Sequence, residues 1–223
     1  MQTAMLTQAE RERMVATQIE ARGITDPQVL DAMRAVPREA FVPRSLARLA
    51  YNDGPLAIGH GQTISQPYVV AVMTAAAELK PGARALEIGT GSGYGAAVLS
   101  RIAAEVYTIE RVGALAEEAR ARLAALGYAN VHVLEGDGTL GWPEHAPYDA
   151  IVVTAGGPQV PKALLHQMAV GGRLVMPVGP IGDQRLVRVV RTEAHEYEYQ
   201  DLEPVAFVPL IGAEGWPEGD RHV

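Results

Sequence analysis

Three glycines at every second position, Gly89, Gly91 and Gly93, directly follow a short apolar segment. A helix-like apolar pattern begins immediately after them, so we predict a strand, a sharp turn and a helix. Such a turn leaves bare backbone at the carboxyl end of a strand, beside the positive end of a helix, where a nucleotide-like ligand can lie. The G-x-G-x-G spacing differs from the G-x-G-x-x-G pattern of dinucleotide sites. It therefore favours S-adenosylmethionine over NAD, although an ordinary tight turn in an α/β domain can have the same spacing.

Strand and helix patterns alternate through the rest of the core. Short apolar segments predict strands at residues 83–88, 105–109, 131–134, 149–153 and 173–176. This alternation predicts right-handed crossovers and a parallel sheet that is covered on both faces. Residues 186–190 and 197–207 have strand character with no helix between them, which predicts an antiparallel hairpin. We therefore predict an α/β fold: a doubly wound, mostly parallel Rossmann-like sheet with a C-terminal antiparallel hairpin and an N-terminal helical cap.

The composition limits the class of protein. With 223 residues the chain is expected to form one domain, with a helical cap and substrate loop at 1–80 and a cofactor-binding core at 81–223. The net charge of −7 argues against a nucleic-acid binder. The absence of cysteine and the scattered histidines argue against a metal site. No signal sequence or long apolar run is present, so we expect a cytoplasmic monomer that does not bind membranes.

Two carboxylates follow the next two predicted strands. Glu110 ends the second strand, roughly 20 residues after the glycine turn, where an acid can accept hydrogen bonds from ribose hydroxyls. Asp137 follows the third strand, where it can accept from an adenine amino group. Taken alone, Glu110 is equally consistent with a solvated charge at a helix start, and Asp137 with an Asp-Gly turn. Their occurrence at successive strand ends favours a cofactor site made by Gly89, Thr90, Gly91, Gly93, Glu110, Asp137 and Gly138.

The segment Gly59-His-Gly-Gln-Thr-Ile-Ser-Gln-Pro67 resembles the signature loop of the protein-L-isoaspartate (D-aspartate) O-methyltransferase family. The resemblance extends over residues 14–216 and includes the blocks 148–158, 171–179 and 207–212. One departure is Gln66, which stands where some relatives have Ala. General S-adenosylmethionine enzymes would share the glycine turn but not this loop.

The resemblance implies that Ser65 is the active-site residue and that Thr63, Ile64 and Ser65 bind the substrate. It implies methyl esterification of the α-carboxylate of L-isoaspartyl and D-aspartyl residues in damaged proteins and peptides, which starts repair through a succinimide. S-adenosylmethionine would be the cofactor and S-adenosylhomocysteine the product. A carboxylate of pKa about 4 is already ionised at neutral pH, so the reaction needs orientation more than a general base.

Other interpretations of these residues remain open. From local sequence alone, a helix-cap serine ahead of Pro67 explains Ser65 better, and the family loop reverses that preference. We expect His60 to pack within the loop. A methyltransferase of the same fold could act on another small molecule or on RNA, although the acidic balance counts against RNA. A cofactor-binding adaptor without activity is a further alternative, against which the presence of Glu110, Asp137 and Ser65 counts.

Overall fold

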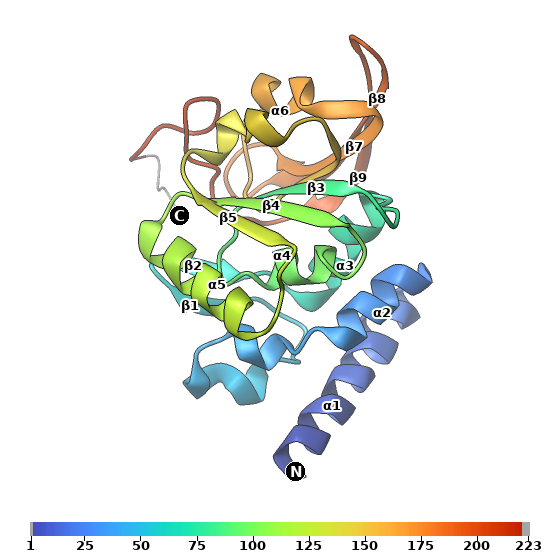
Figure 1. Ribbon diagram of the computed structural model, residues 1–223, viewed down its shortest axis with the longest axis vertical. Coiled ribbons are helices and arrows are strands. Elements are labelled where there is room, and N and C mark those ends of the chain that lie inside the picture. The colour runs from blue at the N-terminus through green and yellow to red at the C-terminus, as the bar shows by residue number, and fades with distance from the viewer. Residues whose placement is uncertain (1, 220–223) are drawn as a thin grey trace.

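The computed structural model describes residues 2–219, and a seven-stranded sheet forms its centre (Figure 1). The strand order is β5-β4-β3-β6-β7-β8-β9. The strands are β3 (Arg84–Ile88), β4 (Glu105–Glu110), β5 (Val131–Glu135), β6 (Tyr148–Val153), β7 (Met168–Val178), β8 (Gln184–Glu193) and β9 (Glu196–Val205).

The pairing of these strands confirms the predicted fold class. Strands β5, β4, β3, β6 and β7 are parallel, whereas β8 pairs antiparallel with β7, and β9 pairs antiparallel with β8. The chain runs outward from β3 through β4 to β5 and then returns to β6 on the other side of β3. Ligands in open α/β sheets bind at the carboxyl edge beside such a reversal. The topology therefore places a candidate site at the ends of β3 and β6.

Helices cover both faces of the sheet (Figure 1). Helices α3 (Pro67–Ala76), α4 (Tyr94–Leu99) and α5 (Gly113–Ala125) lie on one face, and α6 (Lys162–His166) lies on the other. Outside α3 and α4 lie the N-terminal helices α1 (Gln2–Met14) and α2 (Pro27–Ala35). Within residues 2–219, none of the helices has the length and apolar character needed to cross a bilayer.

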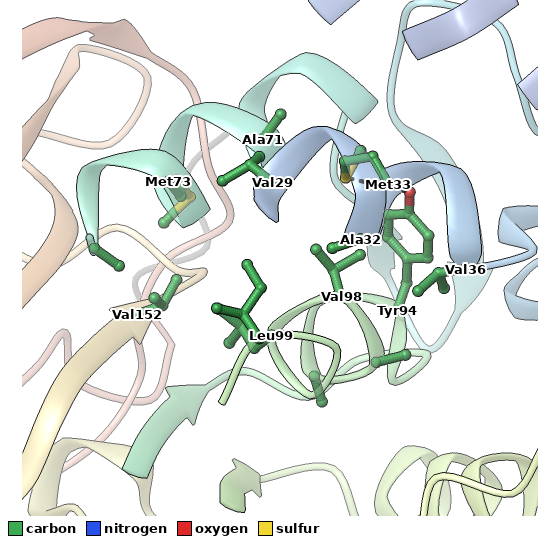
Figure 2. Close-up of a cluster of buried hydrophobic side chains, with 14 of the residues drawn as sticks. Val29, Ala32, Met33, Val36, Ala71, Met73, Tyr94, Val98, Leu99 and Val152 are labelled. Atoms are coloured by element: carbon green, nitrogen blue, oxygen red, sulfur yellow. Dashed lines mark hydrogen bonds between the residues drawn. The ribbon is translucent and has the colours of Figure 1, made fainter. Parts of the chain in front are cut away.

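The cap and the sheet share one buried apolar cluster (Figure 2). Helix α2 contributes Val29, Ala32 and Met33, whose spacing forms a single apolar stripe on one helix face, and the residue that follows the helix, Val36, is buried beside them. The stripe faces apolar side chains from other elements: Ala71 and Met73 on α3, Tyr94, Val98 and Leu99 on α4, and Val152 on β6. The cap is therefore packed onto the core through apolar contacts contributed by both parts of the chain.

The segment between residues 50 and 66 contains most of the Gly59–Pro67 loop. It contains a short antiparallel hairpin of β1 (Leu56–Gly59) and β2 (Gln62–Ile64). Three successive residues at its tip have positive φ angles: Gly59 (93°), His60 (52°) and Gly61 (69°). His60 is exposed at this tip, so the expectation that it packs within the loop is wrong. Periodicity could not identify strands this short, because one strand has four residues and the other has three.

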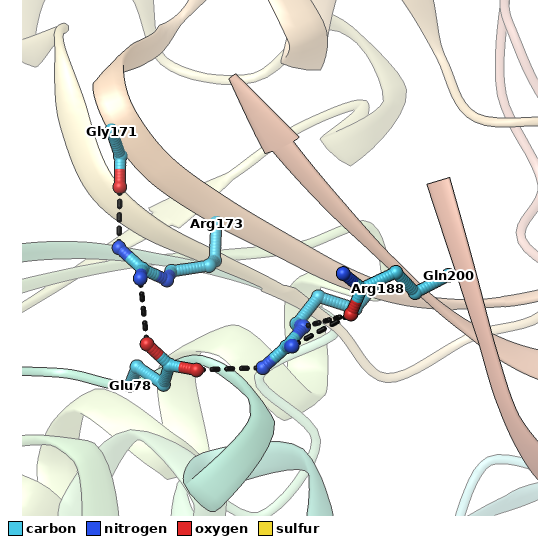
Figure 3. A network of polar contacts seen from close by, with 5 residues as sticks. All are labelled: Glu78, Gly171, Arg173, Arg188 and Gln200. Atoms are coloured by element: carbon cyan, nitrogen blue, oxygen red, sulfur yellow. Dashed lines mark hydrogen bonds and ion pairs between the residues drawn. The ribbon is translucent and has the colours of Figure 1, made fainter. Parts of the chain in front are cut away.

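A polar network holds the end of α3 against the antiparallel edge of the sheet (Figure 3). Glu78 follows α3 with a φ of 47°, and its carboxylate accepts hydrogen bonds from Arg173 (2.6 Å) and Arg188 (2.7 Å). Arg188 also donates to Gln200 on β9. The partly exposed ion pairs contribute only modestly to stability. Their effect is positional, because they fix the helix that follows the substrate loop.

Candidate functional site

The glycine turn after β3 has a backbone that other residues rarely adopt. The φ angles of Gly89, Gly91 and Gly93 are 94°, 51° and 90°. These values lie in the left-handed region, which glycine enters without steric penalty. At Gly89 a side chain is also excluded by space, because a Cβ would lie 2.4 Å from Thr154 Oγ1. The alternate spacing of the glycines is therefore a conformational requirement of the turn.

A cavity opens beside this turn, at the carboxyl ends of the parallel strands. Its floor is formed by the ends of four strands, with Gly89 and Gly91 after β3, Glu110 on β4, Gly138 after β5 and Thr154 after β6. The hairpin tip and the C-terminal segment form its walls, through residues 61–63, 181 and 208–211. The cavity thus offers main-chain groups below and apolar side chains around, as small-molecule sites commonly do. We call it the first cavity.

Glu110 connects the glycine turn to the start of α5. Its side chain is 6% exposed, one oxygen accepts from the Gly91 amide at 2.8 Å, and the other accepts from the Val112 amide at 2.9 Å. Each carboxylate oxygen can accept about two hydrogen bonds, so capacity remains for the hydroxyl groups of a ligand. The carboxylate is therefore oriented by the protein while it keeps acceptor capacity beside the cavity.

Asp137 lies beside the first cavity, in an adjoining recess that it lines together with Arg111 and Trp216. Its Oδ1 accepts from the amide and the hydroxyl of Thr139, at 2.9 and 2.7 Å. Its Oδ2 accepts from the Ala213 amide at 2.7 Å. Asp137 therefore anchors the C-terminal segment that walls the first cavity, and Oδ2 keeps one lone pair for a further donor.

The remaining predicted cofactor residues support the turn from behind. Gly93 is the N-cap residue of α4, and Thr90 is buried beneath the turn. The Thr90 hydroxyl lies 2.7 Å from that of Thr108, which donates to Glu87 at 2.6 Å. Neither Gly93 nor Thr90 lines the first cavity. They contribute to the shape of the turn.

The sequence did not predict a role for Glu87, which lies in β3 beneath the turn. Its carboxyl group is 1% exposed, and burial raises its pKa to about 8, with the nearby Glu110 charge adding to the effect and the Thr108 hydrogen bond opposing it. Glu87 is therefore protonated and neutral at pH 7. A carboxylate inside an otherwise apolar strand, two positions before the first glycine, is the signal that could have found it.

A second cavity adjoins the first one. Its lining includes Thr63, Ser65, Gln66 and Tyr68 from the substrate loop and α3, Arg22 from the cap, and residues 203–208 from the end of β9 and the segment after it. The two cavities share Thr63, Thr154 and Val208. Ligands in the two cavities would therefore meet at these residues. Thr154 and Val208 lie within the blocks 148–158 and 207–212, and neither residue was predicted to belong to the site.

Ser65 lies between the end of β2 and the start of α3, and it lines the second cavity. The N-cap residue of α3 is Gln66, and no side chain caps this helix. Helix capping therefore does not account for Ser65. Ile64, predicted to bind substrate, is only 4% exposed and belongs to the core cluster, and it lines neither cavity. Ile64 could therefore contact a substrate only through its backbone.

Comparisons with known proteins identify relatives of this chain. A family model for protein-L-isoaspartate (D-aspartate) O-methyltransferase matches residues 9–215. Protein-L-isoaspartate O-methyltransferase 1 of Rhodopseudomonas palustris (strain HaA2) is 62% identical over 220 residues, which cover 96% of this chain and 90% of that protein. Protein-L-isoaspartate O-methyltransferase 2 of Pelobacter propionicus is 63% identical over 207 residues, which cover 92% of each chain.

Solved structures show the same similarity. A protein-L-isoaspartate O-methyltransferase aligns with a TM-score of 0.82 at 30% identity, covering 92% of this chain and 67% of that chain. A protein-L-isoaspartate O-methyltransferase from Plasmodium falciparum, in complex with S-adenosyl-L-homocysteine, aligns with a TM-score of 0.79 at 25% identity. That alignment covers 90% of this chain and 98% of the other.

The raised pKa of Glu87 predicts how stability depends on pH. Because the pKa is ordinarily 4.5 and rises to about 8 on folding, the folded chain holds this proton more tightly than the unfolded chain. Its contribution to stability is full below the unfolded pKa and is lost as the pH rises through the folded pKa, by at most about 1.4 kcal/mol per pH unit. Glu87→Gln does not titrate, so we expect this variant to gain stability relative to wild type between about pH 5 and about pH 8.

Urea denaturation at several pH values measures this difference. Glu198→Gln is the matched control, because Glu198 is exposed on β9 and its replacement should leave the pH dependence unchanged. Parallel stability curves for wild type and Glu87→Gln would show that Glu87 is ionised in the folded chain.

Proposed function

The chain belongs to the protein-L-isoaspartate (D-aspartate) O-methyltransferase family, and we propose that it uses S-adenosylmethionine to esterify the α-carboxylate of isoaspartyl and D-aspartyl residues in peptides and damaged proteins. The observation that carries this proposal is the junction of two cavities at Thr63, Thr154 and Val208, with Ser65 on one side and the glycine turn on the other. This function accounts for both cavities. The family matches favour it over the small-molecule, RNA and adaptor alternatives.

We assign the first cavity to S-adenosylmethionine. The bare backbone of Gly89 and Gly91 would hold the methionine part, Glu110 would accept from the ribose hydroxyls, and Gly138 and Asp137 would lie near the adenine. The fit is supported by the unused acceptor capacity of Glu110 beside main chain that carries no side chain. When bound, the cofactor supplies a methyl group on a sulfonium, whose sulfur keeps the bonding electron pair after transfer to a carboxylate oxygen, leaving S-adenosylhomocysteine.

We assign the second cavity to the isoaspartyl residue and its flanking backbone. The hydroxyl groups of Ser65 and Thr63 would hold the α-carboxylate at the junction of the cavities. That carboxylate is ionised at neutral pH, so no residue of this chain has to remove a proton. The task of these residues is to bring one carboxylate oxygen into line with the methyl group and to keep water out. The methyl ester would then close to a succinimide without further help from the enzyme.

We also propose that the chain works as a single domain, with the cap and substrate loop at 1–80 and the cofactor core at 81–223. The shared apolar cluster supports this organisation, because Met33 and Phe41 of the cap pack with Tyr94 of the core. The substrate loop is then held at a fixed place relative to the cofactor site.

The assignment of Glu110 predicts weaker cofactor binding in Glu110→Ala. Each lost hydrogen bond to a charged group costs roughly 1.5–3 kcal/mol, which corresponds to a loss of affinity of about 10- to 150-fold. Titration calorimetry with S-adenosylhomocysteine measures it. Glu118→Ala is the control, because Glu118 lies on α5 with a side chain that is 54% exposed. Unchanged affinity in Glu110→Ala would remove this residue from the site.

The assignment of Ser65 predicts a kinetic defect without a stability defect. Ser65→Ala should lower kcat or raise KM for an isoaspartyl peptide, because the carboxylate loses one hydrogen-bond donor. A helix-cap role would instead lower stability by about 0.5–2 kcal/mol with turnover intact. Melting curves and steady-state kinetics separate the two outcomes, and the exposed Ser45, replaced by Ala, serves as the control.

The proposed substrate predicts discrimination between two peptides that differ only in Asp against isoAsp. The isoaspartyl link adds a methylene to the backbone and presents the α-carboxylate on a side arm. A misplacement of about 1 Å can lower the rate by about 10²-fold, so the normal aspartyl peptide should react far more slowly. Transfer of label from S-adenosylmethionine measures both rates. Equal labelling, or labelling of neither peptide, would contradict the proposed substrate.

A further inference from the structure

Arg38 is a fully buried cation in the N-terminal cap. It lies in the 3-10 segment Arg38–Phe41, with 0% exposure. Among the ion pairs formed by residues 2–219, none includes Arg38. The adjacent Glu39 carboxylate accepts instead from the Tyr51 hydroxyl. A charge buried without an opposite charge is costly, so its contacts should reveal what it contributes.

The guanidinium group binds two backbone carbonyls and an aromatic face. Nε donates to the Ala50 carbonyl at 2.8 Å, and Nη2 donates to the Ser65 carbonyl at 2.7 Å. The guanidinium carbon lies 4.8 Å from the ring centroid of Tyr94 on α4. Nη1 is buried without a hydrogen-bond partner. Arg38, which belongs to the cap, therefore contacts three other parts of the chain. These are the start of the segment that leads to the hairpin, the substrate loop, and helix α4 of the core.

The contact with Ser65 is a buried anchor of the substrate loop, which is also held by the Gln66 side chain through its hydrogen bond to Asp53. Ser65 follows the last residue of β2, and Pro67 opens α3 without an amide hydrogen. On the amino-terminal side, the buried Ile64 fixes the chain. On the carboxyl-terminal side, the Ser65 carbonyl belongs to the peptide group that joins Ser65 to Gln66. Its bond to Arg38 fixes the orientation of that peptide plane and restrains the Ser65 backbone from which the side chain leaves.

We propose that Arg38 is a positioning residue for methyl transfer, which acts through the Ser65 carbonyl to hold the Ser65 hydroxyl toward the substrate carboxylate in the second cavity. The inference rests on the proposed function of Ser65. It explains why an arginine occupies a buried place without an acidic partner. The planar guanidinium can bind two carbonyls at once while it stacks on Tyr94, which a lysine ammonium cannot reproduce.

The test measures steady-state kinetics of Arg38→Lys and Arg38→Met with an isoaspartyl peptide, together with binding of S-adenosylhomocysteine. Arg38→Met keeps much of the side-chain volume but removes both donors. We expect its kcat/KM for the peptide to fall by about 10²-fold, with a raised peptide KM and unchanged cofactor affinity. Arg38→Lys should show a smaller loss in the same direction, because it retains the charge and can bind one carbonyl.

A merely structural role would give a different pattern. Leu30→Ala is the matched control, because Leu30 is buried in the same cap cluster and contacts neither cavity. It should lower Tm and the active fraction while the peptide KM stays unchanged. If Arg38→Met behaves like this control, the positioning role is overturned. If Arg38→Met does not fold, Arg38→Lys carries the same comparison, and an unchanged peptide KM in that variant overturns the role.

A double substitution tests the route through Ser65. In a Ser65→Ala background, Arg38→Met should reduce the rate far less than it does in wild type, because the group that it positions is already missing. Equal reductions in the two backgrounds would show that Arg38 acts elsewhere. A wild-type chain that is inert toward the isoaspartyl peptide would instead contradict the proposed function itself, so the two failures are distinguishable.

Discussion

The hydrogen bond from the Gly91 amide to the Glu110 carboxylate ties the glycine turn to the end of the neighbouring strand β4. It acts together with the bonds from the Gly89 amide to the Ile109 carbonyl and from the Thr154 hydroxyl to the Gly89 carbonyl, and these contacts hold the left-handed backbone of the turn after β3 in place. The second oxygen of Glu110 accepts from Val112, at the N-cap position of α5. The turn, the carboxylate and the start of α5 thus form a single unit. These hydrogen bonds within the chain orient the carboxylate beside the first cavity.

A buried polar layer lies behind this unit. Glu87, Thr108 and Thr90 form a chain of hydrogen-bonding groups under the glycine turn. The layer also explains Gly95 on α4, where a Cβ would lie 2.2 Å from the Glu87 carboxyl. The close approach of helix and strand excludes water from Glu87, and this exclusion raises its pKa. A neutral acid here avoids placing a second negative charge behind Glu110.

Local patterns sufficed to predict the fold, and the prediction of the cofactor side of the site also rests on local patterns. The glycine spacing, the alternation of strands and helices and the acid at the end of β4 are all signals within short segments, and the fold confirms the predicted sheet. The rest depends on contacts between distant segments. From the sequence alone, Arg38 resembles an ordinary surface charge, because the Ser65 carbonyl that it binds lies 27 residues away along the chain. Likewise, Asp137 accepts a hydrogen bond from Ala213, which lies 76 residues further along the chain, and a periodic pattern in a short segment cannot predict such a contact.

The site therefore has two halves, which differ in the parts of the fold that hold them in place. The proposed cofactor half consists mainly of strand ends, so the sheet itself holds it in place. The proposed substrate half consists of the cap, the hairpin, the end of β9 and the segment after it. Gln184 of β8 holds that segment through hydrogen bonds with Phe207, whereas the cap and the hairpin lie outside the seven-stranded sheet. Long-range contacts fix the cap, the hairpin and α3: Arg38 with Ser65, Gln66 with Asp53, and Glu78 with Arg173 and Arg188. A misplacement of the substrate carboxylate by about 1 Å can lower the rate by about 10²-fold. We therefore expect selectivity for a substrate that differs by one backbone methylene to depend on these anchors as well as on the groups that touch the substrate.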